Sequence, residues 1–325
     1  IFAEGSHKFL ARSRTRHSER FEWKRADELE AYRGPGPREY GGKLKPGSSL
    51  ANRRRGHQLV VGARYEKTRE RVLPAEARFL GYMIGDGCAR NQTPMWTNVD
   101  PVVRASFEEC VRSLGGNTKR ADEQTLRVNS GVGHGPGRVH HLRQLLERHG
   151  VQGKTAHDKR VPVAIFRADN EAVAHFLAAY FECDGTKTGH YQSSIGSVSR
   201  GLLEDCQHLL ARLGVRSALR QKRGTYKGKP HLSWCLSIYD EATFYAAVPV
   251  VGAKAQDSAR FSTRYIREDG VLLDTVVSVR AAGERSCWCI RVEHDESFLA
   301  NGVVTHNTSA IQFAIAQAIA RDPRI

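Results

Sequence analysis

Apolar positions along the chain cluster in two windows that share one plan. The first window, FLGYMIGDG over residues 79–87, ends in an acid and a glycine. It predicts a helix, because Pro74 is tolerated in a first turn and Glu76 suits the positive N-terminal end. Gly87 is placed to end that helix in a left-handed conformation. Asp86 then lies in the last turn, where the helix dipole is negative and a bound cation would offset the unfavourable anion.

The second window, FLAAYFECDG over residues 176–185, repeats this plan. Small residues line one face of each predicted helix: Gly81 and Gly85 in the first, and the pair Ala178-Ala179 in the second. Faces with so few side-chain atoms allow two helices to approach closely. For a single window, the alternative is a buried core helix with a stray acid at its exposed end.

Both windows belong to an internal repeat. Asp184 follows Asp86 by 98 residues, and Cys206 follows Cys110 by 96 residues. The segments around the two cysteines both predict amphipathic helices that end at a glycine. A repeat of this size indicates two similar lobes related by a pseudo-two-fold axis. Packing the two helices together would bring both carboxylates to one point, where Mg²⁺ would offset their repulsion and suit phosphoryl chemistry.

Both windows resemble the LAGLIDADG motif of homing endonucleases, and the resemblance covers roughly residues 74–268. It implies two αββα lobes with a saddle of antiparallel strands over double-stranded DNA. It also implies Asp86 and Asp184 as metal-binding catalytic acids and Mg²⁺ as the cofactor. Lys159 opens the sequence KRVP, which resembles the Lys-x-x-Pro element of intein-borne members. The implied role of this lysine is contact with phosphate or with the attacking water.

The position two residues before each acid differs between the motifs. The first motif has Ile84 where many family members carry another acid, and the second motif has Glu182. We interpret this as a packing position, so Ile84 does not indicate an inactive nuclease. The alternatives that remain are a nuclease domain that binds DNA without cutting it, and a DNA-binding regulator or RNA maturase built on the same lobes without splicing.

The charge balance favours a polyanionic partner. The chain has 325 residues, with 50 Lys and Arg against 35 Asp and Glu, and a formal net charge of +15. Such a surplus favours DNA, because each neutralised phosphate releases counterions. Residues 220–229, RQKRGTYKGK, predict the tip of a two-stranded ribbon that could enter a groove, although a solvated loop is the alternative for any single cluster. The candidate DNA-binding residues are Arg220, Lys222, Arg223, Lys227 and Lys229.

Other classes of protein are disfavoured. No apolar run approaches the length of a bilayer-spanning helix and no signal peptide is visible, so no membrane partner is expected. The 7 cysteines are an odd number without a repeated spacing, which indicates the reducing cytoplasm rather than a disulfide framework. A zinc site from Cys287, Cys289 and His294 is a weak alternative, because no second pair is present. A chain with an internal duplication is expected to act as a monomer.

The C-terminal part of the chain carries a second chemistry. Residues 287–306 predict two strands joined by a tight Asn-Gly turn, for which a plain hairpin is one interpretation. The second strand, however, leads into His306-Asn307-Thr308. An Asn amide can attack its own backbone carbonyl and release the next residue, and a neighbouring His can donate a proton to the leaving amine. Thr308 then offers a hydroxyl nucleophile.

Residues 287–308 closely resemble the C-terminal splice junction of inteins. The sequence GSHKFL, residues 5–10, resembles the intein region that polarises the upstream scissile bond, which implies His7 as its histidine. The resemblance implies an all-β, horseshoe-like splicing domain of the Hint type. Its two parts would be residues 1 to about 50 and residues 271–307, with the endonuclease inserted between them.

Several positions modify this resemblance. Ile1 does not suit an intein start, so earlier strands and an N-terminal nucleophile are expected upstream. Cys289 stands where ordinary inteins carry Asp, and Thr305 immediately precedes His306. This combination resembles class 3 inteins, in which the internal Cys attacks the upstream bond. That class carries Trp at the site of Phe9 here, and Cys289 as a buried strand residue is the alternative.

The splicing path implied by the resemblance needs no cofactor. Cys289, helped by His7, attacks the upstream peptide bond and forms a branched thioester. The acyl chain passes to the hydroxyl of Thr308. Asn307 then cyclises with His306 as the acid, and an ester-to-amide shift leaves a native peptide bond between the flanking sequences.

Residues 308–325 differ in composition from the rest of the chain. They are rich in Ala, Ile and Gln with a helical period, and Thr308-Ser309 opens the segment as these residues do after Gly-Lys in a phosphate-binding loop. We therefore expect the host protein to be a P-loop ATPase, such as a replicative helicase or terminase. Any amphipathic helix is the alternative.

The predicted fold class is mixed α+β: an all-β splicing domain split by a duplicated αββα endonuclease domain. The predicted domains are residues 1–70 for the first splicing part and linker, 71–268 for the endonuclease with lobes at about 74–157 and 158–268, 269–307 for the second splicing part, and 308–325 for the start of the host.

Overall fold

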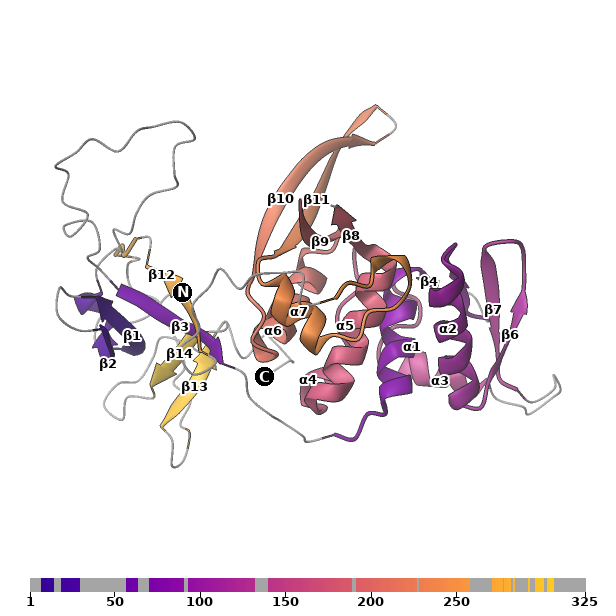
Figure 1. Ribbon diagram of the computed structural model, residues 1–325, viewed down its shortest axis with the longest axis horizontal. Helices are drawn as coiled ribbons and strands as arrows, with labels where there is room; N and C mark the ends of the chain where they lie inside the picture. Colours follow the sequence, from indigo (N-terminus) through magenta and orange to yellow (C-terminus); the bar gives the residue numbers. More distant parts are fainter. Residues whose placement is uncertain are drawn as a thin grey trace. The chain divides into compact units, whose positions relative to one another are not determined.

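The computed structural model divides into two compact units (Figure 1), Arg64–Ile266 and the combination of Ile1–Ala63 with Arg267–Ile325. It describes residues 7–14, 19–29, 57–63, 70–90, 93–131, 140–188, 191–226, 228–257, 271–276, 278–281, 283, 292, 296–300 and 303–306.

The unit Arg64–Ile266 is central in the sequence and is called the central unit. Two long helices, α1 (Pro74–Gly85) and α5 (Asn170–Asp184), lie side by side in its middle (Figure 1). Pro74 is the first residue of α1, as predicted, and the side chain of Asp169 caps α5 by accepting a hydrogen bond from the Ala172 amide. Both helices are apolar and almost fully buried, because each packs against its twin on one side and against its own lobe on the other.

Each helix begins a lobe with the same order of elements. Lobe one consists of α1, β4 (Gly87–Cys88), β5 (Met95–Thr97), α2 (Pro101–Ser113), β6 (Asn117–Arg120), β7 (Thr125–Asn129) and α3 (His141–Arg148). After the short helix α4 (Val163–Arg167), lobe two consists of α5, β8 (Gly185–Thr188), β9 (Tyr191–Ser197), α6 (Arg200–Arg212), β10 (Ser217–Tyr226), β11 (Lys229–Ile238) and α7 (Glu241–Ala247).

The two antiparallel sheets also correspond strand for strand. The strand order is β4-β5-β7-β6 in lobe one and β8-β9-β11-β10 in lobe two. Each lobe therefore extends the predicted αββα pattern by a second pair of strands and a closing helix. The β10–β11 hairpin forms the predicted two-stranded ribbon and extends well beyond the rest of its sheet (Figure 1).

Glycines mark the helix ends in two different ways. Gly115 and Gly214 follow α2 and α6 in the left-handed conformation, with φ of 77° and 76°, which confirms the predicted stops. The prediction for Gly87 is wrong, because this residue is not left-handed. The chain turns directly from α1 into β4, and any Cβ at Gly87 would collide with the backbone of Met83. Glycine is needed there for space, and Gly185 meets the carbonyl oxygen of Phe181 in the same way.

The other unit contains a sheet built from both ends of the chain. Its described strands are β1 (Lys8–Arg14), β2 (Glu19–Arg25), β3 (His57–Ala63), β12 (Val271–Thr275), β13 (Ser297–Ala300) and β14 (Val303–His306). The order is β12-β3-β1-β14-β13, with β2 pairing β1 at the side. Strands that precede the central unit in sequence, β1 and β3, therefore pair with strands that follow it, β14 and β12, in one sheet.

Some predicted features cannot be located. The following lie outside the described residues: Lys227, Cys287, Cys289, His294, Asn307, Thr308 and the helix expected over residues 309–325. Within the part of the chain that is described, no helix is both long and apolar enough to cross a bilayer.

Candidate active site

Two carboxylates lie at the matching ends of the twin helices. Asp86 is the C-cap of α1 and Asp184 is the last residue of α5. Burial raises the pKa of Asp184 to about 6, and the negative charge of Asp86 adds to the rise. The two acids are therefore close enough to repel one another in a partly dry environment, as the repeat in the sequence predicts.

The closeness of the acids follows from the contact between the helices. A Cβ placed on Gly81 would lie 2.9 Å from the Cβ of Ala179. One placed on Gly85 would collide with the Cβ of Cys183 and lie 2.9 Å from its Sγ. Small residues at this contact thus let the two backbones approach, and the helix ends converge.

Lobe one holds the carboxylate of Asp86 in place. Asn98 donates a hydrogen bond from Nδ2 to Asp86 Oδ2 over 2.8 Å. The Oδ1 of Asn98 accepts from the backbone amide of Asp100 over 2.9 Å, which fixes the orientation of the Asn98 amide. A polar chain therefore leads from Asp86 to the N-cap of α2.

A lysine binds the end of each twin helix. Lys159 donates from Nζ to the carbonyl oxygens of Gly85 and Gly87 over 3.0 and 3.3 Å. Lys254, in η3 (Gly252–Lys254), donates from Nζ to the carbonyl oxygens of Glu182 and Cys183, both over 2.7 Å. Carbonyls at the C-terminal end of a helix lack partners within it and carry its negative dipole end, so an ammonium group is favoured there.

The same lysines interact with the acids. Burial lowers the pKa of Lys159 and of Lys254, and the nearby Asp86 and Asp184 carboxylates oppose this change in both cases. Two ammonium groups and two carboxylates therefore share one partly buried location.

Lys254 was not among the residues predicted from the sequence. It follows Lys159 by 95 residues, close to the spacing of 98 residues between the acids, so the repeat offset could have pointed to it. The signal is weak because Pro162 follows Lys159 whereas Pro249 precedes Lys254, so the Lys-x-x-Pro order is not repeated.

The donors at this site suit a hard divalent cation. Across the described ranges, no group of three or more His, Cys, Asp or Glu side chains is arranged to hold a metal. Two carboxylates with room for water and substrate oxygens are the ligand set that Mg²⁺ commonly uses beside phosphates. Burial and, after it, repulsion from Asp86 raise the pKa of Asp184, and such an ion would offset both effects.

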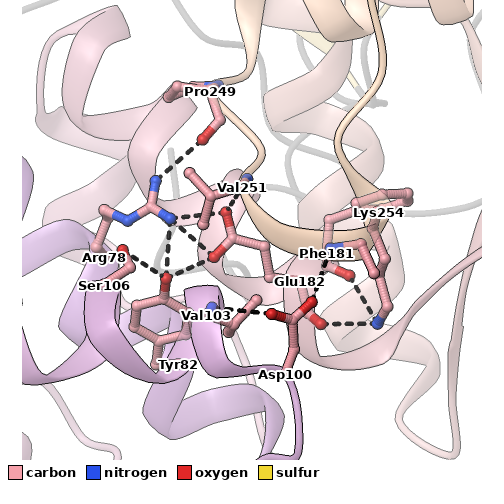
Figure 2. A network of polar contacts seen from close by, with 11 residues as sticks. Arg78, Tyr82, Asp100, Val103, Ser106, Phe181, Glu182, Pro249, Val251 and Lys254 are labelled. Atoms are coloured by element: carbon pink, nitrogen blue, oxygen red, sulfur yellow. Dashed lines mark hydrogen bonds and ion pairs between the residues drawn. The ribbon is translucent and has the colours of Figure 1, made fainter.

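Glu182 takes no part in this acid pair. Its side chain is buried and accepts hydrogen bonds from Arg78 Nη2, 2.7 Å from Oε1, and from Tyr82 Oη, 2.5 Å from Oε2 (Figure 2). The guanidinium of Arg78 also donates to the carbonyl oxygen of Pro249 over 3.1 Å. The position has a packing role, as expected, but a polar one that joins α1 of lobe one to α5 of lobe two.

The basic residues of the β10–β11 ribbon do not share one face. Leu219 and Leu236 face each other and pack toward the helices, so neighbouring positions face away from them. Arg220 and Lys222 lie on that outward face and are exposed, whereas Arg223 lies on the opposite side. Lys229 pairs with Tyr226 near the tip of the ribbon.

The sheet of lobe one has a basic outward face of its own. Leu126 and Val128 are buried, and Arg127 between them is exposed on the other side of β7. Lys119 lies opposite Arg127 on β6 and is also exposed. Neither residue was predicted from the sequence, although the alternation of apolar and polar positions along β7 could have indicated Arg127.

Three of the predicted splicing residues meet in the other unit. Thr305 lies opposite Phe9 in the pairing of β14 with β1, is fully buried, and donates from Oγ1 to the carbonyl oxygen of Phe298 over 3.2 Å. Burial lowers the pKa of His7 to about 4, and repulsion from His306 contributes. His7 and His306 therefore lie close together at neighbouring strands.

The ring of His306 contacts Trp23 edge to face, with the ring centroids 4.9 Å apart. Within the described parts of the chain, Nε2 of His7 is buried without a hydrogen-bond partner. The structure does not place Cys289, Asn307 or Thr308 relative to these residues, because all three lie outside the described ranges.

A family model described as LAGLIDADG-like domain matches residues 171–251. This range runs from α5 to the segment just before Lys254. The predicted LAGLIDADG resemblance is thereby confirmed for lobe two.

Among curated proteins, the replication factor C small subunit of Methanocaldococcus jannaschii is 31% identical over 154 residues, which cover 45% of this chain and 8% of that protein. Protein RecA of Mycobacterium tuberculosis is 30% identical over 203 residues, covering 58% of this chain and 24% of that protein. Elongation factor 2 of Methanopyrus kandleri is 33% identical over 149 residues, covering 45% and 11%. The chain thus spans at most about a quarter of the length of these relatives.

Among solved structures, the homing endonuclease I-DmoI in complex with DNA and Ca is 16% identical, with a TM-score of 0.38, over 54% of this chain and 88% of that chain. A second I-DmoI structure, with its target DNA and Mn, gives the same TM-score and identity over 93% of its chain.

Proposed function

We propose that the central unit is a site-specific DNA endonuclease that cuts both strands of a duplex, with Asp86 and Asp184 as its metal-binding catalytic acids. The observation that carries this proposal is the convergence of the two acids at the ends of twin helices, reflected in the pKa of Asp184 of about 6. The repulsion between two carboxylates in a partly dry site costs folding stability, and a divalent cation bound between them would relieve it.

Mg²⁺ held by Asp86 and Asp184 would activate a water molecule and stabilise the negative charge that develops on the phosphodiester. The chain's own groups orient and balance this site. Lys159 and Lys254 add positive charge next to the acids, where a scissile phosphate would sit. Asn98 holds one carboxylate oxygen of Asp86 in place.

The outward faces of the two sheets supply the DNA contacts in this proposal. Arg220 and Lys222 in lobe two, and Lys119 and Arg127 in lobe one, offer positive charge on equivalent sheet faces. A two-stranded ribbon fits the major groove, and basic side chains along it would contact phosphates and base edges. The net charge of +15 favours binding to any duplex, and base contacts would select the site.

The decisive test is cleavage of the host coding sequence from which the segment encoding this chain has been deleted. The purified protein is incubated with that DNA and Mg²⁺, and the products are separated on a gel. We expect one specific double-strand cut. Binding without cutting would favour the alternative of a decayed nuclease domain.

We also propose that the other unit excises, by splicing, an insert that ends at Asn307 and leaves residues 308–325 with the host protein. The support is the sheet in which strands from before the central unit pair with strands from after it, together with the proximity of His7, Thr305 and His306. His7 is neutral near pH 7 because of its low pKa, so its ring can accept a proton or a hydrogen bond at an upstream bond.

The relatives support an insert of this kind. Stretches of about half of this chain match proteins with unrelated names, and they occupy only 8% to 24% of those proteins. Members of a single host family would share the host sequence, whereas a mobile insert is shared by hosts that have little else in common.

The splicing proposal is tested in the precursor that carries its natural flanking sequences. Replacing Asn307 with Ala should block release of the downstream segment, since the side chain that cyclises is gone. Cys289→Ala should leave the upstream bond intact. If that variant splices normally, an ordinary nucleophile at the intein start replaces Cys289 in the mechanism.

The host is proposed to be a P-loop ATPase, such as a replicative helicase or terminase, with the chain acting as a monomer in the cytoplasm. Thr308-Ser309 would continue a phosphate-binding loop after splicing. The coding sequence upstream of the insert tests this proposal, because the flanking segment should end in Gly-Lys.

A further inference from the structure

The chain segment that carries each active-site lysine is anchored on the opposite lobe. The first lysine segment, residues 159–161, leaves lobe one and brings Lys159 to the end of α1. Its backbone, however, is bonded to lobe two: Ser199, the N-cap of α6, donates from Oγ to the carbonyl oxygen of Lys159 over 2.9 Å.

A buried carboxylate of lobe two strengthens this anchor. Asp205 on α6 accepts from the backbone amide of Val161 over 3.1 Å and from Nε of Arg160 over 2.8 Å. The Asp205 carboxylate is fully buried, although Arg160 is half exposed, so leaving this carboxylate without its partners would be costly. The first lysine segment is thus held by α6 at two points.

The second lysine segment, residues 249–254, shows the reverse arrangement. It leaves lobe two and brings Lys254 to the end of α5, yet Asp100, the N-cap of α2 in lobe one, accepts from the backbone amide of Ala253 over 2.7 Å (Figure 2). In the same segment, the carbonyl oxygen of Pro249 accepts a hydrogen bond from Arg78 of α1. The amide of Val251 donates over 2.9 Å to Glu182, which is itself bound to Arg78.

Asp100 and Ser199 are equivalent residues of the repeat. They lie 99 residues apart and cap α2 and α6, and the amide of each is bound by a side chain two residues earlier, Asn98 at 2.9 Å and Ser197 at 3.1 Å. In Asp100, Oδ1 caps the helix while Oδ2 binds Ala253. In Ser199, Oγ accepts from the Leu202 amide and donates to Lys159. Each cap therefore has a second partner on a lysine segment.

We propose that Asp100 and Ser199 are positioning residues that set the placement of the lysine belonging to the other lobe, Lys254 for Asp100 and Lys159 for Ser199. The proposal rests on the nuclease function proposed above. A duplex has two antiparallel strands and this site has two matching halves, so each lysine serves one strand. Disturbing one cap then slows the cutting of one strand and leaves the other strand nearly unaffected.

Two substitutions remove the anchors while keeping the helix caps, because Asn and Asp are both good N-cap residues. Asn has one side-chain oxygen where Asp has two. Asp100→Asn therefore cannot both cap α2 and accept from the Ala253 amide. Ser199→Asp keeps an acceptor for the helix but has no proton for the Lys159 carbonyl. Asp169→Asn, at the N-cap of α5, is the matched control because Asp169 caps its helix without bonding a lysine segment.

The experiment uses the full chain and two substrates that carry the target. A supercoiled plasmid reports nicked against linear products, and a linear duplex, end-labelled on one strand or the other, gives the cleavage rate of each strand. We expect Asp100→Asn to slow one strand about 10- to 100-fold, the scale of loss that a misplacement of about 1 Å can cause, so that nicked circles accumulate. Ser199→Asp should slow the other strand. Lys254→Met and Lys159→Met identify which strand each lysine serves. Asp100→Asn must slow the same strand as Lys254→Met, and Ser199→Asp the same strand as Lys159→Met.

The outcomes separate this inference from the proposed function. If the unmodified protein makes no cut, the nuclease proposal fails first. If it cuts, but the cap variants slow both strands equally or affect neither, the positioning roles are wrong. Unfolding by denaturant identifies a variant that has merely lost stability, and such a variant would slow both strands together.

Discussion

The backbone at Gly81 lies so close to Phe176 that a Cβ at position 81 would be 2.5 Å from the Phe176 carbonyl oxygen. This contact joins the two lobes and sets how closely the acids meet. Gly81→Ala should therefore push the helices apart and destabilise the central unit by about 1–3 kcal/mol, the usual cost of overpacking a core. Denaturant unfolding measures the change. Gly196→Ala is the control, since nothing lies within 4 Å of its added methyl group, and an equal loss in both variants would contradict the packing argument.

The Arg78–Glu182 pair should be far more sensitive to substitution than a surface pair. Glu182→Gln leaves the buried guanidinium of Arg78 without its charge partner, which typically costs about 3–5 kcal/mol. The exposed pair of Arg143 and Glu147 is the control, where Glu147→Gln should cost no more than about 0.5 kcal/mol. Both values come from denaturant unfolding. Replacing Arg78 and Glu182 together by methionine should recover much of the loss, and no recovery would show that the network is needed for more than charge balance.

Asp86→Asn and Asp184→Asn should each abolish cleavage and leave DNA binding nearly unchanged. An amide keeps the shape of the side chain but removes the charge that holds a divalent cation. Binding depends on the basic sheet faces, so fluorescence anisotropy with labelled target DNA should give similar affinities. A joint change of Arg220 and Lys222 to Gln should have the opposite effect, with weaker binding and a shallower dependence on salt. If either Asp86→Asn or Asp184→Asn still cuts at the normal rate, the aspartate replaced is not part of the catalytic site.

Lys254→Met should impair cleavage as strongly as Lys159→Met, because the two ammonium groups take equivalent positions at the helix ends. Methionine has a similar length but carries neither the positive charge nor the N–H donors of lysine. Single-turnover rates at saturating DNA measure the chemical step and exclude effects on affinity. Lys187→Met on β8 is the control for a general loss of positive charge. A normal rate for Lys254→Met would mean that this residue only caps α5.

His7 should titrate far below the ordinary range of histidine. Burial, followed by repulsion from His306, lowers its pKa from 6.5 to about 4. The folded state therefore favours neutral His7, and the stability from this group is complete above pH 6.5 and is lost as the pH falls toward 4. An NMR titration of labelled histidine rings, with the His7 signal assigned by its absence in His7→Asn, should show a midpoint near pH 4. A midpoint near 6.5 would place His7 in water and away from His306.

Much of the active site was predictable from local patterns. Apolar runs that end in Asp-Gly predicted α1 and α5, and the repeat predicted that Asp86 and Asp184 would meet. The left-handed glycines after α2 and α6 were predictable for the same reason, because helix stops have local chemistry. Gly87 was misjudged, since its requirement is space near Met83 rather than a positive φ. A local pattern does not reveal which atoms will approach a residue from elsewhere.

The sequence by itself determined the duplicated helices, the pair of acids and the positive surface, because periodicity, residue type and charge are properties of short stretches. Only the tertiary structure decided that Lys254 joins Lys159 at the helix ends, that Glu182 pairs with Arg78, and that each lysine segment is tied to the other lobe. These bonds link distant positions, such as Asp100 and Ala253, which are 153 residues apart. Their partners are selected by the packing of two lobes around one helix pair, a contact that no stretch of sequence contains.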